Sequence, residues 1–62
     1  MSRFIELKST NGSGHVYINV ANIAYVEESR SQTIVHICAG SDSLKSVYVK
    51  EDYKTVISMI DD

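Results

Sequence analysis

The feature that most constrains the fold is the alternation of β-branched side chains with polar or aromatic ones in short runs. In residues 15–20, Val16 and Ile18 alternate with His15, Tyr17 and other non-β-branched positions, and residues 33–38 repeat the same spacing. Side chains two positions apart lie on the same face of a β-strand, whereas a helix brings together positions three or four apart. The spacing therefore predicts strands in both runs.

Five runs of this kind occur, and turn-forming residues separate them. The expected strands are residues 3–8, 15–20, 24–29, 33–38 and 44–49. Asn11-Gly12, between the first two runs, is a strong hairpin signal. Residues 21–23 are too few for an α-helix, so a tight corner or a single 3₁₀ turn is expected there.

The period changes after Val49. Apolar residues then follow the spacing i, i+3, i+4, i+7: Tyr53, Val56, Ile57 and Ile60. This is one face of an α-helix, and Glu51 and Asp52 favour its positive N-terminal end. We therefore expect a mainly β (α+β) protein with one domain over residues 1–62. It is a five-stranded antiparallel meander, or a curled half-barrel, with one C-terminal α-helix packed on one face.

A chain of 62 residues has a thin core, because a domain of this size buries only about 60% of the surface of its unfolded chain. Small domains usually add disulfides, metal or self-association. Cys38 is the only cysteine and the chain has two histidines, so neither a disulfide within the chain nor a zinc cluster is expected. Self-association remains, and no cofactor is expected.

The helix can cover only one face of the sheet. We expect it to cover the aliphatic face, which contains Ile5, Leu7, Val16, Ile18, Val20, Val26, Val35, Ile37, Val47 and Val49. The opposite face then carries a set of aromatic, aliphatic and sulfur side chains, which we take as the candidate interface: Phe4, Tyr17, Tyr25, Ile34, His36, Cys38 and Tyr48. Exposed apolar patches of this size mark interaction sites.

Three explanations account for this second face. The sheet curls and buries part of it, or the face pairs with a second copy of the chain or another protein. Alternatively, its aromatic rings stack with single-stranded nucleic acid. The third explanation needs basic residues nearby, whereas Glu6 and Glu27 share this face and the net charge is −2. Nucleic acid is therefore the less favoured partner.

Catalytic residues are not expected. His36 and Cys38 share one face of a strand, but the sequence offers no third ligand or orienting acid at a recognisable spacing. The N-terminal residues contain no apolar run long enough for an export signal or a membrane span. A non-enzymatic, cytoplasmic interaction protein without membrane contact is the expectation.

Part of the chain resembles a known DNA-binding domain. The pattern I-N-V-x-x-I-x-Y-[IV]-E is found at Ile18, Asn19, Val20, Ile23, Tyr25, Val26 and Glu27. It is similar to the opening strands of LytTR DNA-binding domains and covers less than half of the chain. This resemblance implies a related sheet, and it makes a nucleic-acid-binding accessory protein the alternative function.

A second resemblance extends over more of the chain. It consists of two glycine turns, three strand patterns and a V-x-E sequence before the helix: Gly14, Asn19, Ile23, Val26, Glu27, Thr33, Val35, Ile37, Gly40, Val49, Glu51, Val56 and Ile60. This layout resembles the FlbD-like small proteins. It implies a shared fold of similar length, of a kind common among bacterial and phage genes.

Overall fold

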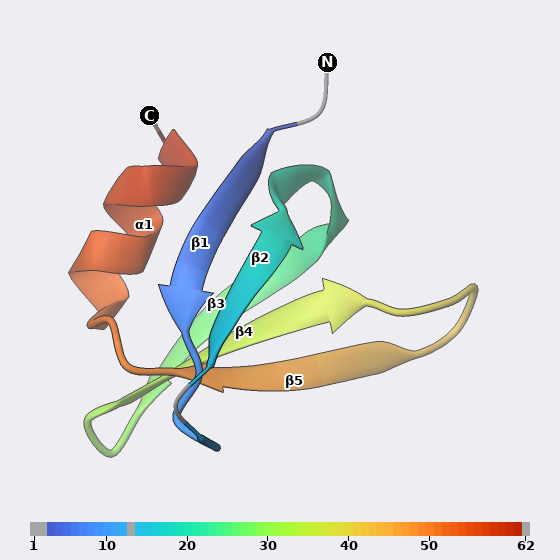
Figure 1. The fold of residues 1–62 in the computed structure, drawn as a ribbon. Coiled ribbons are helices and arrows are strands. Elements are labelled where there is room, and N and C mark those ends of the chain that lie inside the picture. Colours follow the sequence, from blue (N-terminus) through green and yellow to red (C-terminus); the bar gives the residue numbers. More distant parts are fainter. Residues whose placement is uncertain (1–2, 13, 62) are drawn as a thin grey trace.

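The structure is a computed structural model, and it describes residues 3–12 and 14–61. Its elements, drawn in Figure 1, are β1 (Phe4–Lys8), β2 (His15–Asn19), the 3₁₀ turn η1 (Val20–Asn22), β3 (Ile23–Ser29), β4 (Gln32–Cys38), β5 (Leu44–Val49) and α1 (Tyr53–Asp61). All strand pairs are antiparallel. The expected mainly β fold with five antiparallel strands and a C-terminal helix is confirmed.

The five strands form two sheets rather than one. β1 pairs with β2, and β3, β4 and β5 form a second sheet with β4 in the centre. The break falls at η1, where the Asn19 side chain accepts a hydrogen bond from the Ala21 N–H at 3.1 Å. This cap stabilises the 3₁₀ turn that the sequence predicted, and the turn redirects the chain. As a result, the β1–β2 hairpin lies across the three-stranded sheet (Figure 1).

Backbone hydrogen bonds join the two sheets at one end of the described structure. An isolated bridge pairs Ser9 with Val49, and the Thr10 N–H donates to the Tyr48 carbonyl at 3.0 Å. The Lys50 N–H donates to the Lys8 carbonyl at 2.8 Å. We call these contacts the seam. Within the described residues they do not close the sheets into a barrel.

The core lies between the two sheets and under the helix. Leu7 of β1, Val35 of β4 and Val56 of α1 are completely buried. The remaining core positions are Ile5, Ile18 and Val49, with Val16, Val20, Ile23, Val26, Ile37, Val47, Met59 and Ile60 packed against them. All ten positions of the predicted aliphatic face are in this core or packed against it, so the predicted inner face is confirmed, but the two sheets cover it together with the helix. Burial of each large aliphatic side chain contributes about 1.5–3 kcal/mol to folding.

Asp52 is the residue that caps the N-terminus of α1. Its carbonyl accepts the first helical hydrogen bond, from the Val56 N–H at 3.1 Å, and its carboxylate accepts from the Thr55 hydroxyl. Hydrogen bonds from the hydroxyl and backbone N–H of Thr55 lower the pKa of Asp52. The sequence predicted a helix within residues 51–62. The observed helix begins at Tyr53, and Asp62 lies outside the described residues.

The C-terminus of α1 is capped from the other end of the chain. The Arg3 guanidinium donates hydrogen bonds to the carbonyls of Met59 and Ile60, the latter at 2.6 Å. The last carbonyls of a helix have no partners within the helix, and a cation is favourable at this negative end. Arg3 therefore attaches the helix to the start of β1.

Candidate interaction surfaces

The candidate interface predicted from the sequence is divided between the two sheets. Phe4 and Tyr17 belong to the β1–β2 hairpin, whereas Tyr25 and the remaining candidates belong to the three-stranded sheet. Because the inner side of each sheet contacts the core, these side chains project from two different outer sides. The sequence pattern could not reveal this, since the alternation continues on both sides of η1.

The first outer side, which we call the hairpin face, consists of Phe4, Glu6, Lys8, His15, Tyr17 and Asn19. The Phe4 and Tyr17 rings are stacked with their centroids 5.1 Å apart and 13° between their planes. Tyr17 is nevertheless 71% exposed and Phe4 45% exposed. The stack thus presents an aromatic surface that the chain itself leaves open.

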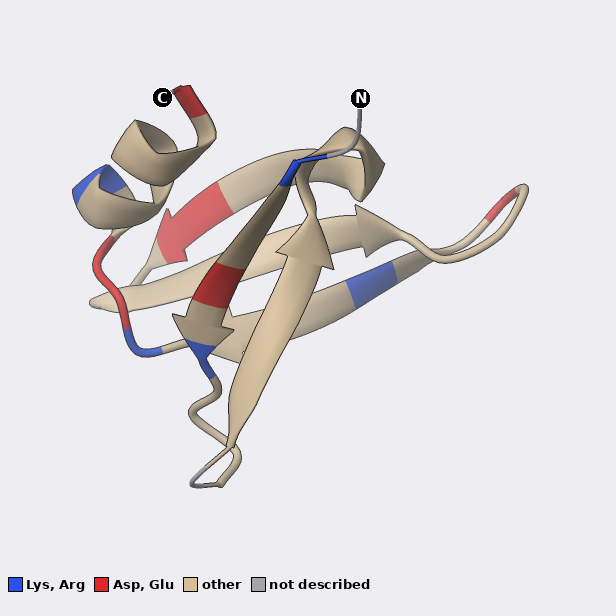
Figure 2. Cartoon of the chain, turned by 45° about the horizontal axis from the view of Figure 1, so that its top comes forward, with Lys and Arg blue, Asp and Glu red and all other residues tan. Residues whose placement is uncertain are grey.

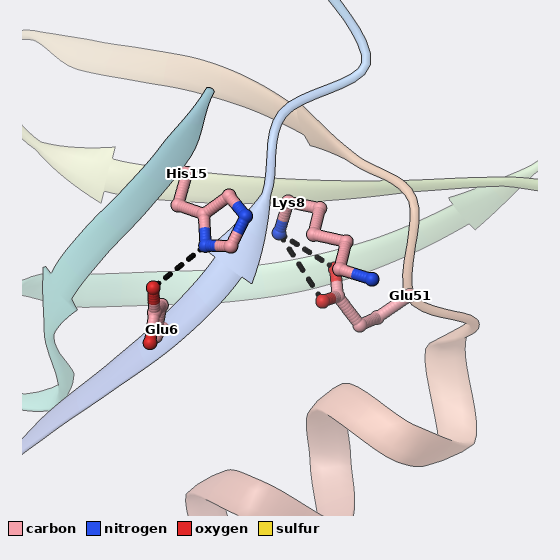
Figure 3. Close-up of polar contacts among 4 residues, drawn as sticks. All are labelled: Glu6, Lys8, His15 and Glu51. Atoms are coloured by element: carbon pink, nitrogen blue, oxygen red, sulfur yellow. Dashed lines mark hydrogen bonds and ion pairs between the residues drawn. The ribbon is translucent and has the colours of Figure 1, made fainter. Parts of the chain in front are cut away.

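A hydrogen-bonded pair of side chains lies beside this stack. The His15 Nδ1 and Glu6 Oε2 atoms are 2.6 Å apart, across neighbouring strands (Figure 3). The same view includes a second polar contact, in which the Glu51 carboxylate accepts the backbone N–H of Lys8 with both oxygens, at 3.0 and 3.1 Å. Glu51 therefore caps the edge of β1 instead of the helix.

The second outer side, which we call the sheet face, consists of Tyr25, Glu27, Ile34, His36, Cys38, Leu44, Ser46 and Tyr48. Tyr25 stacks on His36 with a centroid distance of 4.1 Å. Leu44 is 53% exposed and was not among the predicted candidates. Its position four residues before Tyr48 places it on the same side of the strand, so the period-2 spacing could have identified it.

Two predicted candidates on the sheet face offer little surface to a partner. Ile34 is only 7% exposed, although it lies on the outer side of β4, with Glu27 and Tyr48 as its cross-strand neighbours. The His36 side chain is 12% exposed. We correct the expectation accordingly, because on the central strand the neighbouring side chains cover both residues.

The His36 imidazole is fixed by hydrogen-bond partners on both sides. Glu27 Oε1 lies 3.0 Å from Nε2, and Ser46 Oγ lies 3.3 Å from Nδ1. A Ser–His–carboxylate order is also found in hydrolases, but those enzymes place N–H donors where an oxyanion forms. Here the three residues lie on adjacent strands, and the backbone of β4 is paired with strands on both sides. These contacts orient the ring beneath Tyr25.

Other kinds of site are not found in the described part of the chain. Residues 3–12 and 14–61 contain no group of three His, Cys, Asp or Glu side chains that could hold a metal ion, and no pocket. Their helix is not long and apolar enough to cross a membrane. Acidic and basic segments are interspersed over the strands and the loop before α1 (Figure 2). The outer faces remain as the candidate functional surfaces.

Comparisons with protein-family models, with curated proteins and with solved structures found no match for this chain. The FlbD-like and LytTR resemblances therefore stay predictions. The class of protein is defined by the fold alone, as a small antiparallel β protein with one C-terminal helix.

Proposed function

We propose that this chain is a non-enzymatic interaction protein that self-associates through the hairpin face. The observation that carries the proposal is the exposure of the Phe4–Tyr17 stack. Tyrosine and phenylalanine each bury a large apolar area in a contact, and Tyr17 keeps a hydroxyl that can stay hydrated. An aromatic pair that stacks outside the core is typical of the centre of a protein–protein interface.

The hairpin face is a better candidate than the sheet face. On the sheet face, Ile34 is buried, the His36 side chain has partners on both ring nitrogens, and Tyr25 stacks on it. These side chains already contact one another, which leaves less of their surface for a partner. Tyr17 has the largest exposed fraction among the large hydrophobic side chains that are exposed. The most exposed single aromatic ring therefore lies on the hairpin face, although the sheet face also carries exposed Tyr25, Leu44 and Tyr48.

The thin core also supports self-association. A compact protein of 6.9 kDa exposes about 4,000 Å² by the usual scaling of surface with mass. This chain exposes 4419 Å². Covering part of that surface with a second copy would add apolar burial that the chain alone lacks.

The charges near the aromatic rings disfavour the alternative of nucleic-acid binding. Glu6 lies beside the Phe4–Tyr17 stack, and Glu27 contacts His36 beneath Tyr25. Binding of single strands combines aromatic stacking with basic residues along the backbone. A carboxylate beside each stack would instead repel phosphate.

Light scattering coupled to gel filtration, from micromolar to millimolar concentration, tests the proposal. We expect a mass that rises above 6.9 kDa with concentration. Tyr17→Glu should remain monomeric, because an interface would bury its carboxylate without a partner. Tyr25→Glu, the matched control on the other face, should associate like the parent chain. A mass of one chain at every concentration would overturn the proposal, as would dissociation by Tyr25→Glu alone.

Fluorescence anisotropy with single-stranded and duplex DNA tests the alternative. We expect no binding at low salt. Binding that weakens steeply as salt is added would instead support nucleic-acid recognition, since counterion release produces that dependence.

A further inference from the structure

The backbone of β2 has one edge without a strand partner in the described structure. Arg3 and Val20 form a hydrogen-bonded pair, as do Ser9 and Gly14, which fixes the alternation of bonds between β1 and β2. In an antiparallel pair, every second residue directs its N–H and C=O away from the partner. On β2 these residues are His15, Tyr17 and Asn19. Their N–H and C=O groups point away from β1.

Lys8 provides a check on this alternation. It is opposite His15 in the register, and so its own backbone groups should point away from β2. They do, since the Lys8 N–H donates to Glu51 and its carbonyl accepts from Lys50. The outer edge of β1 is therefore occupied at Lys8.

The other strand edges carry features that discourage pairing. β3 has a register irregularity between Ile23 and Tyr25 and packs beside α1. β5 carries Lys45, and the seam at Val49 occupies one end of its outer edge. Bulges, lysines and covering elements are the usual means by which proteins block edge pairing. β2, with the sequence His-Val-Tyr-Ile-Asn, has no lysine, proline or bulge.

We propose that a second copy of this chain binds at the β2 edge, with the two β2 strands antiparallel and Tyr17 on the twofold axis. This inference deepens the proposed function and rests on it. The register pairs Tyr17 with its own copy and His15 with the Asn19 of the other chain. It joins the two hairpins into one four-stranded sheet, and a two-stranded sheet alone is only marginally stable.

The register is self-complementary. It uses the outward backbone groups of His15, Tyr17 and Asn19 on both copies. It also brings the two Phe4–Tyr17 stacks together on one continuous outer face. Across the new strand pair no two like charges are directly opposite, because His15 faces an asparagine. Glu6 stays beside the His15 of its own chain.

Hydrogen exchange at low and high protein concentration is the first test. The Tyr17 amide should exchange quickly in the monomer and at least about tenfold more slowly in the dimer, since pairing buries its N–H in a hydrogen bond. The Tyr25 amide, on the sheet that does not join the dimer, is the internal reference. Stabilisation of the whole fold slows its exchange as well, so edge pairing is measured by the additional protection of Tyr17 over Tyr25. A dimer whose Tyr17 amide still exchanges as in the monomer would overturn the edge pairing while leaving self-association intact.

Substitution of Asn19 separates the backbone from the side chain. Asn19 has φ −75° and ψ 118°, which proline can adopt, and its N–H points away from β1. Asn19→Pro and Asn19→Ala both remove the capping amide, but only the proline removes the N–H. We expect Asn19→Pro to raise the dimer dissociation constant at least about tenfold relative to Asn19→Ala, because symmetry removes two hydrogen bonds. Equal constants would contradict the proposal.

Cross-linking tests the register. Cα atoms in a hydrogen-bonded antiparallel pair are about 5.5 Å apart, a distance that a disulfide can span. In a Cys38→Ser background, a mixture of His15→Cys and Asn19→Cys chains should form a disulfide-linked dimer under mild oxidation. This register places the two positions opposite each other, and both chains keep Tyr17. Glu6→Cys is the control, because the two Glu6 positions would be separated by three strand spacings of about 4.8 Å. Cross-linking between Glu6→Cys chains but not between the His15→Cys and Asn19→Cys chains would exclude this register.

Discussion

The Glu51 carboxylate accepts the backbone N–H of Lys8, so the residue that follows Lys50 in the loop before α1 terminates the open edge of β1 (Figure 3). The two residues are 43 positions apart. The Lys50 N–H reinforces this contact by donating to the Lys8 carbonyl at 2.8 Å. Together these bonds attach the hairpin to the segment that leads from β5 into the helix.

Glu51→Ala should therefore destabilise the fold. A hydrogen bond to a charged group contributes about 1.5–3 kcal/mol when sheltered, and solvent near this contact reduces the expected loss to about 1 kcal/mol. For a domain of this size that loss lowers the thermal midpoint by about 4–8 °C. Circular dichroism on heating measures it. Glu28→Ala, which removes an exposed carboxylate of β3, is the control and should change the midpoint little.

Removal of the Arg3 side chain should loosen the end of α1. We expect Arg3→Met to cost about 0.5–1 kcal/mol, because the Met59 and Ile60 carbonyls lose a cationic donor. Amide exchange of residues 59–61 should accelerate, while exchange in β4 should not. Lys54→Met removes a cation near the opposite end of the helix and should leave residues 59–61 unchanged. Slower exchange in Arg3→Met would contradict the capping role.

A glycine in the turn between β3 and β4 should increase the stability of the fold. Arg30 has φ 53° and Ser31 has φ 66°, the left-handed conformation that a two-residue type I′ turn requires. Side chains other than glycine and asparagine fit that region poorly. Ser31→Gly should raise stability by about 1 kcal/mol, measured as a higher urea midpoint with an unchanged slope. Ser41 is not among the described residues with positive φ, so Ser41→Gly is the control and should give no gain in stability.

The capping of α1 by Asp52 should depend on pH. The pKa of Asp52 is lowered from its usual 3.8, chiefly by the hydrogen bond from the Thr55 hydroxyl. A carboxyl group whose folded pKa is depressed contributes stability above the unfolded pKa, and that contribution is lost as pH falls through the folded pKa. Thr55→Val should raise the pKa of Asp52 toward 3.8, as measured by NMR titration of its carboxyl carbon. An unchanged pKa would show that the hydroxyl is not the cause.

Strands, inner face and helix could be predicted from the sequence because they depend on local periodicity. Val16, Ile18 and Val35 each lie two positions from another β-branched residue, so these side chains share one face of their strand. They pack together in the core. Likewise, the spacing from Tyr53 to Ile60 is sufficient to identify a helix. These signals are reliable because burial of apolar area makes the largest favourable contribution to folding.

The division of the candidate interface was not predictable in the same way. Tyr17 and Tyr25 have the same alternation on either side of η1, and nothing in the pattern indicates how far the 3₁₀ turn rotates the chain. The capping contacts of Arg3 and Glu51 were missed for a related reason. Each contact joins residues more than forty positions apart. The sequence alone does not indicate which of many distant groups an arginine or a glutamate will contact.

The seam has a consequence for how the chain folds. The β3–β4 hairpin closes through two residues and the β1–β2 hairpin through a short loop, so both can form in microseconds. Ser9 and Val49, by contrast, meet only after a long loop has closed, and closure of distant contacts slows folding. We therefore expect docking of two preformed hairpins at this bridge to set the folding rate. Substitutions around Val49 should change that rate more than substitutions in either turn.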